Sequence, residues 1–123
     1  MNASGLMAKA QQAAASARLL LDAADADGAC NRAYYALFDA ARAALLASGH
    51  AAGKTHRGVL SAFSEHLIKD GALPKDMGRW LKQAETRRYV ADYEGDPVEL
   101  ADARAMVEQA EAFIAAIRAA FTL

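Results

Sequence analysis

Hydrophobic residues recur at steps of three and four along most of this chain, which is the spacing expected of amphipathic helices. The first such pattern extends from Ser4 to about Ala24, and a second one ends at Ser48–Gly49. The stretch at positions 25–28, with two aspartates and a glycine, interrupts the helical path between them. The first part of the chain is therefore predicted to form two long helices.

A shorter pattern from Val59 to Leu67 predicts a third helix, which is expected to stop at Asp70–Gly71. Pro74 then suits the first position of a fourth helix, because a backbone N–H at that position has no partner within the helix. The second part of the chain is thus predicted to be helical as well.

A fifth helix is expected to start with a capping box. Asp96 would be its N-cap, Pro97 its first residue, and Glu99 the glutamate that completes the box. Its hydrophobic pattern continues from Ala103 to Phe121. Because short loops join these helices, we predict an all-α fold, an antiparallel bundle of four to five helices.

Length and composition indicate one compact domain in a reducing compartment. The chain has 123 residues, is 54% hydrophobic and contains only 2 prolines, so residues 1–123 are assigned to a single folded domain. The lone Cys30 has no partner for an internal disulfide and is interpreted as a small buried hydrophobe. No apolar stretch reaches the roughly 18 residues that a membrane-spanning helix needs, and the amino terminus lacks a signal-peptide pattern. We therefore expect a cytoplasmic protein with no membrane partner.

The fourth helix carries the first candidate for chemistry. Arg88 and Asp92 are four residues apart, so they share the side of the helix that begins as core-facing. Either they form an ion pair of purely structural value, or they line a polar cleft. Arg87 and Tyr93 adjoin them, and cations for phosphates with rings for bases are what a protein needs to hold single-stranded RNA. The net charge of −1 gives no general attraction for polyanions, so no DNA partner is expected.

The second helix carries aromatic and basic residues near its start. Tyr34 joins its hydrophobic side, where a core aromatic with a satisfied hydroxyl is the simpler interpretation. Arg32 and Tyr35 fall nearer the opposite side. Arg32 is either an ordinary solvated cation or an extension of a cationic pocket around Arg88, and both interpretations stay open.

The three histidines, His50, His56 and His66, lack the spacing of a zinc site. The chain also has no phosphate loop, dinucleotide-binding glycine pattern or serine-elbow motif, so no metal and no cofactor are expected. His56 lies where the third helix starts. It either works as a general acid or base near neutral pH or is only a polar residue at the start of the helix without a catalytic role.

Three blocks of sequence together resemble the HEPN domain family, in its small stand-alone bacterial branch. The blocks are residues 31–38, 54–59 and 88–93, and the resemblance covers about Leu6 to Phe121. It implies a bundle that forms homodimers and that is often encoded beside a minimal nucleotidyltransferase, as a toxin and antitoxin pair. RNA cleavage in a cleft between the two protomers is the implied toxic activity.

One position departs from the motif of active HEPN ribonucleases, which carry an arginine and, a few residues later, a histidine. Arg87 has this spacing to position 92, but Asp92 stands where the histidine is expected, and the block at 88–93 fits the pattern of the small branch. The difference matters because a histidine transfers protons near neutral pH, whereas an ionised aspartate is a weak base.

The resemblance leads to the hypothesis of a toxin-like protein that binds RNA or nucleotide in a dimer-interface cleft. If it cleaves RNA, it is a metal-independent endoribonuclease. The catalytic candidates are Arg88, Asp92 and His56, and the RNA-binding or nucleotide-binding candidates are Arg32, Arg87, Tyr93 and Tyr35. The alternative is a catalytically inactive interaction module that docks on a nucleotidyltransferase, and a purely structural helical dimer is a third interpretation.

Overall fold

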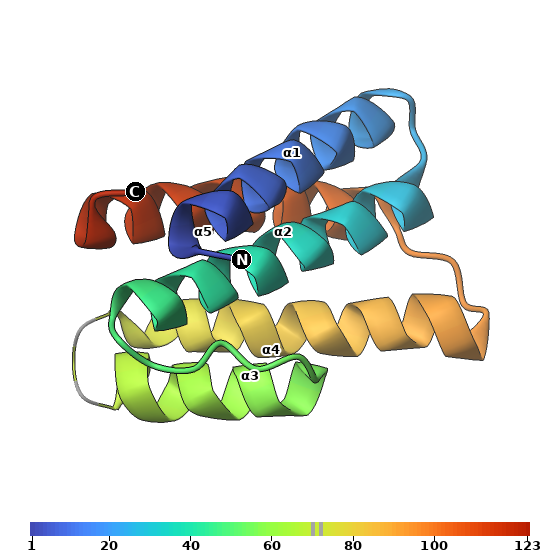
Figure 1. Cartoon of the computed structure of the whole chain (residues 1–123). Helices are drawn as coiled ribbons and strands as arrows, with labels where there is room; N and C mark the ends of the chain where they lie inside the picture. Colours follow the sequence, from blue (N-terminus) through green and yellow to red (C-terminus); the bar gives the residue numbers. More distant parts are fainter. Residues whose placement is uncertain (70, 72) are drawn as a thin grey trace.

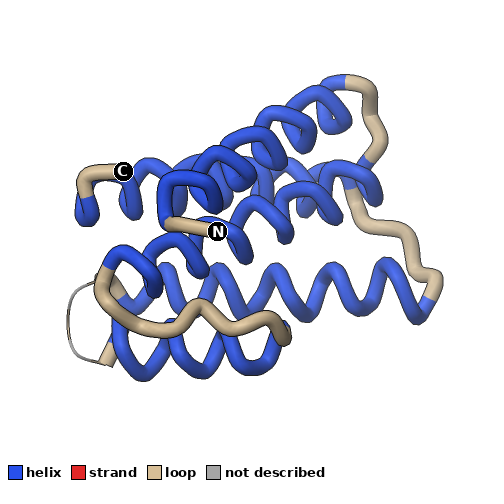
Figure 2. The backbone as a smooth tube through the Cα atoms, in the orientation of Figure 1, coloured by secondary structure: helices blue, strands red, loops and turns tan. Residues whose placement is uncertain are grey.

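The computed structural model describes residues 1–69, 71 and 73–123, and these form an all-α bundle (Figures 1 and 2). The helices are α1 Ala3–Asp22, α2 Ala26–Ala47, α3 His56–Phe63, α4 Lys75–Tyr89 and α5 Leu100–Phe121. Two π-helical turns, η1 Ser64–Ile68 and η2 Val90–Glu94, extend α3 and α4. The predicted all-α class is confirmed, and the described residues contain no strand. The predicted stop at Asp70 lies outside the described residues.

Helix α2 is the centre of the bundle, because it contacts each of the other four α-helices. In Figure 1, α1 and α5 lie on one side of it, while α3 and α4 run side by side along the other. Much of the buried surface of α2 is alanine, including Ala33, Ala36 and Ala40. Alanine lets neighbouring helices approach closely but buries little area, so larger side chains supply most of the hydrophobic stabilisation. None of the described helices is long and apolar enough to cross a membrane.

The predicted hydrophobic patterns do face the core. Fully buried large side chains from four helices include Leu6, Leu37, Phe63 and Phe113. Cys30 is buried too, with its Sγ atom 3.3 Å from the sulfur of Met106. Burial raises the pKa of the Cys30 thiol to about 11, so the group stays protonated at neutral pH. As the sequence indicates, Cys30 is a small hydrophobe of the core.

The turn between α1 and α2 is shorter than predicted. Asp25 is the N-cap of α2, and its Oδ1 atom accepts a hydrogen bond of 2.9 Å from the backbone N–H of Gly28. A Cβ atom at position 28 would collide with the Asp25 carboxylate. The polar stretch at 25–28 therefore starts the helix instead of separating two helices, since Gly28 leaves room for the cap.

The predicted capping box at the start of α5 is wrong. The helix begins at Leu100 with Glu99 as its N-cap, and no side chain caps it. Instead, the backbone N–H of Val98 donates a 2.8 Å hydrogen bond to Oδ1 of Asp27, at the start of α2. This long-range bond holds the chain before Leu100 in a non-helical path. Pro74 is also displaced by one position, because it is the N-cap of α4 and not its first residue.

We expect the replacement Asp27→Ala to lower the free energy of unfolding by about 1 kcal/mol, because it leaves the Val98 N–H without its acceptor. The control Asp96→Ala removes the aspartate that a capping box would have used, and it should change stability by less than about 0.5 kcal/mol. Urea unfolding followed by circular dichroism measures both. The opposite order of the two effects would contradict the observed start of α5.

Candidate functional site

A buried arginine on α4 is the centre of the candidate site. The apolar side formed by Met77, Leu81 and Ala84 continues into Arg88, as the sequence predicts, and Arg88 is only 6% exposed. Its guanidinium carbon lies 4.8 Å from the centroid of the Tyr34 ring on α2. A cation stacked on an aromatic face is attracted to it, but burial of the charge is costly unless carboxylates neutralise it.

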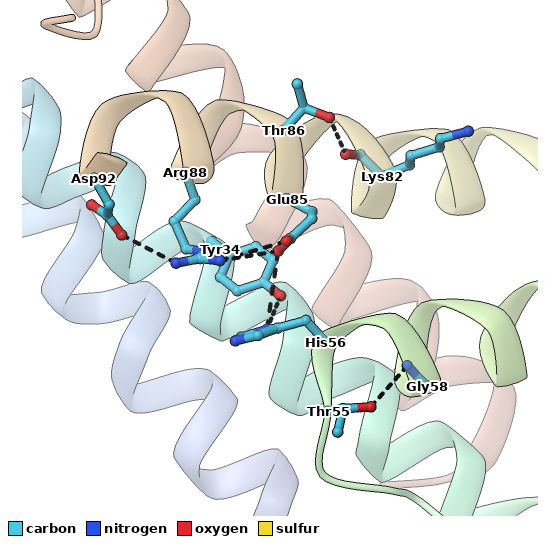
Figure 3. A network of polar contacts seen from close by, with 9 residues as sticks. All are labelled: Tyr34, Thr55, His56, Gly58, Lys82, Glu85, Thr86, Arg88 and Asp92. Carbon is cyan, nitrogen blue, oxygen red and sulfur yellow. Dashed lines mark hydrogen bonds and ion pairs between the residues drawn. The ribbon is translucent and has the colours of Figure 1, made fainter. Parts of the chain in front are cut away.

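Two carboxylates from the same stretch of chain supply this neutralisation (Figure 3). Nη1 of Arg88 lies 3.2 Å from Oδ2 of Asp92, and Nη2 lies 3.4 Å from Oε2 of Glu85. Residues three before and four after Arg88 stand on its side of the helix, which is why both can reach it. Burial alone would lower the pKa of Arg88, but the attraction of Glu85 and Tyr34 outweighs it and raises that pKa.

Glu85 connects the arginine to a histidine on another helix. Its Oε2 atom is 4.0 Å from Nδ1 of His56, and the Tyr34 hydroxyl shares a hydrogen bond with the same nitrogen. Thr55 caps α3 by accepting a 3.0 Å bond from the N–H of Gly58, which fixes His56 in the first turn. We call Tyr34, His56, Glu85, Arg88 and Asp92 the Arg88 cluster.

The orientation of His56 determines what the cluster presents to a ligand. Figure 3 shows the second ring nitrogen, Nε2, pointing away from Glu85 and Tyr34. The His56 side chain is 38% exposed, whereas that of Arg88 is almost covered. A carboxylate and a hydroxyl that hold one imidazole nitrogen leave the other free to accept or donate a proton. His56 is therefore the accessible imidazole of the cluster.

Tyr34 is the satisfied core aromatic that the sequence predicts, and it is also part of the site. Its ring is fully buried, and its hydroxyl is bonded to His56. Burial, reinforced by the nearby Glu85 carboxylate, strongly raises the pKa of the hydroxyl. Tyr34 therefore stays neutral and holds the imidazole with a hydrogen bond.

Two other candidates lie beside His56. The centroid of the Tyr35 ring is 6.3 Å from that of His56, and the guanidinium carbon of Arg32 lies 5.2 Å from the centroid of the Tyr35 ring. Both residues are half-buried. Arg32 thus approaches the Arg88 cluster through Tyr35, and no ion pair links it to Asp92 among the residues described.

The remaining two candidates lie differently. Arg87 points toward α5, where its Nη2 atom is 3.9 Å from a carboxylate oxygen of Asp102. Tyr93 is 70% exposed, and its ring centroid lies 5.0 Å from that of Tyr89. Its hydroxyl is one of the groups that raise the pKa of Arg88, so Tyr93 stands at the edge of the cluster.

Glu85 is the site residue that the sequence analysis missed. Its position three residues before Arg88 was a usable signal, because a carboxylate at that spacing reaches a helical arginine. Its approach to His56 had no sequence signal, since the two residues are on different helices. The other histidines, His50 and His66, stack on one another with centroids 4.0 Å apart. Across the described part of the chain, no group of three or more His, Cys, Asp or Glu residues is placed to hold a metal ion.

Comparison with known proteins gives several relatives of this chain. A UPF0332 protein of Gloeobacter violaceus, glr0978, is 39% identical over 111 residues, which cover 89% of this chain and 87% of that protein. A UPF0332 protein of Thermotoga maritima is 36% identical, over 89% of this chain and 83% of its own. A protein of Methanocaldococcus jannaschii named "Putative toxin MJ0605" is 33% identical over 72% of this chain and 66% of its own.

The family model described as HEPN domain matches residues 3–120, nearly the whole chain. The match includes α2, α3, α4 and η2, which together supply every residue of the Arg88 cluster. The chain therefore belongs to the HEPN domain family.

Proposed function

We propose that this protein is a toxin-like ribonuclease that binds single-stranded RNA and cleaves it without a metal ion. The observation that carries the proposal is the exposed imidazole of His56, held from behind by Glu85 and Tyr34. The Methanocaldococcus jannaschii relative named "Putative toxin MJ0605" supports the toxin-like part of this proposal. In this proposal His56 takes the role of the histidine that the motif lacks at position 92.

The proposed reaction needs two proton transfers. The ribose 2′-hydroxyl attacks the adjacent phosphorus while its proton passes to Nε2 of His56. The bond between phosphorus and the 5′-oxygen then breaks, and that oxygen takes a proton, which leaves a 2′,3′-cyclic phosphate and a 5′-hydroxyl. Arg32 and Tyr35 stand beside His56 as a cation and a ring for the flanking phosphate and base. The buried Arg88 contributes indirectly, because its ion pair with Glu85 keeps that carboxylate beside His56.

A homodimer would supply the second proton. Within the described part of one chain, His56 is the histidine that the Arg88 cluster contains. A second copy across a cleft would bring a protonated His56 to the leaving 5′-oxygen. The proposed active unit is therefore a pair of chains with the RNA between them.

We expect light scattering at micromolar concentration to give twice the chain mass of 13.0 kDa. Dilution should lower the mass and the cleavage rate together, because both depend on the second copy. A fully active protein with the mass of one chain would contradict the dimer.

We expect His56→Gln to lower RNA cleavage by about 10²–10⁴-fold, since it removes the proton-transfer group. His66→Gln is the matched control, because His66 stacks on His50 outside the cluster, and it should keep wild-type activity. Gel analysis of a labelled single-stranded RNA, run with and without EDTA, measures both rates. Equal rates for wild type and His56→Gln would exclude the proposed role, and complete inhibition by EDTA would exclude the metal-free reaction.

The alternative function is a catalytically inactive module that docks on a nucleotidyltransferase partner. Its support is that Asp92 and Glu85 already occupy both terminal nitrogens of Arg88, as in a purely structural pair. In addition, Tyr89 and Tyr93 form an exposed aromatic pair that a protein partner would cover.

Replacement of the two carboxylates separates these functions. Asp92→Asn should lower the free energy of unfolding by about 0.5–1 kcal/mol, because Asp92 is partly exposed. Glu85→Gln should cost more, about 1–2 kcal/mol, and should also slow cleavage because it frees the imidazole of His56. Chemical unfolding and the RNA assay measure these effects. A loss of stability in both variants, with neither wild type nor variants cleaving RNA, would favour the interaction module.

A further inference from the structure

An open hollow of about 910 Å³ lies between α3–η1 and α4, which run side by side in Figure 1. Glu85 lines it, so the hollow begins beside the Arg88 cluster, and Lys69 and Lys75 line it too. Leu60 and Ile68 supply apolar lining, and the one aromatic lining residue, Phe63, is buried. We call this hollow the α3–α4 groove.

The charge of the groove differs from that of the whole chain. Among the described residues, its lining includes five basic residues and two acidic ones, whereas the chain as a whole has a net charge of −1. The five basic residues are Arg57, Lys69, Lys75, Arg79 and Lys82.

A second hollow, of about 400 Å³, lies beside the same helix. It shares Arg79, Lys82 and Thr86 with the groove and adds Arg87, and none of the described residues that line it is acidic. Within the described part of the chain, the two hollows together are lined by six Lys and Arg residues and by two Asp and Glu residues. Positive charge is therefore concentrated along α4.

Most of this charge has no nearby counter-charge. Among the described residues, no ion pair within 4 Å involves four of the five groove cations, the exception being Arg79, which pairs with Asp76. Of the two acidic lining residues, Glu85 is already paired with Arg88. The remaining field favours an anion that extends along the groove.

We propose that the α3–α4 groove binds the phosphate backbone of single-stranded RNA on one side of His56. This inference rests on the proposed function for the identity of the polyanion. A groove lined by cations tracks a backbone, while the lack of an exposed aromatic ring in its lining leaves no platform for bases. Binding in the groove is therefore independent of base sequence.

The test uses the full chain and a probe that it does not cleave, a fluorescent 2′-O-methyl oligouridylate of about 16 nucleotides. Blocking the 2′-oxygen prevents the attack on phosphorus, so binding is measured apart from cleavage. The variant is Lys75→Gln/Lys82→Gln, which removes two exposed groove cations. The control, Lys9→Gln/Arg104→Gln, removes the same charge from exposed positions on α1 and α5.

Fluorescence anisotropy at a series of KCl concentrations gives the slope of log affinity against log salt. We expect the groove variant to bind more weakly and to lose about 1.4 from the magnitude of this slope, at about 0.7 for each lost phosphate contact. The control should keep the wild-type slope. Unchanged binding by the groove variant, or an equal loss in the control, would overturn the proposal.

Two further results distinguish this inference from the proposed function. Wild-type protein that cleaves RNA, together with a groove variant of unchanged slope, would overturn the groove and leave the ribonuclease. Binding with the expected slopes but without any cleavage would support the groove and contradict the ribonuclease. Fluorescent polyglutamate that binds the wild type where the RNA probe does not would identify a docking surface for an acidic protein and overturn the proposal.

Discussion

The burial of one positive charge is the constraint on which the rest of the site depends. Arg88 is enclosed between α4 and the Tyr34 ring of α2, and a cation in that position is tolerated only because Glu85 and Asp92 neutralise it. Glu85 also faces His56 on α3. The contacts of this one buried side chain therefore connect α4 with α2 through Tyr34 and, through Glu85, with His56 on α3.

Stability and the proposed function consequently share residues. Tyr34 is a core aromatic of the central helix, a surface for the guanidinium of Arg88 and a hydrogen-bond partner of His56. A change at Tyr34 or Arg88 disturbs packing and site together, so activity lost with either residue says little about chemistry. His56 lies at the exposed end of the cluster, where a substitution tests the proposed proton transfer with less effect on the core.

The overall charge of the chain hides a strongly uneven distribution. A net charge of −1 gives no reason to expect a polyanionic partner, yet the hollows along α4 gather positive charge and contain few carboxylates. An extended anion would interact with the local field of the groove, because salt screens charges farther away than about 10 Å. The proposed RNA path and the proposed catalytic histidine adjoin each other, since Glu85 borders both.

The sequence by itself determined the helices, their core-facing sides and the position of Arg88 on such a side, because helical periodicity is a local property of the chain. Tertiary structure decided which distant groups meet. Glu85 reaches His56 only because α3 packs against α4, and α5 begins at Leu100 instead of the predicted Pro97 because the N–H of Val98 is bonded to Asp27 on α2. Arg87 directly precedes Arg88 in the sequence but points toward α5, since adjacent residues of a helix point in different directions.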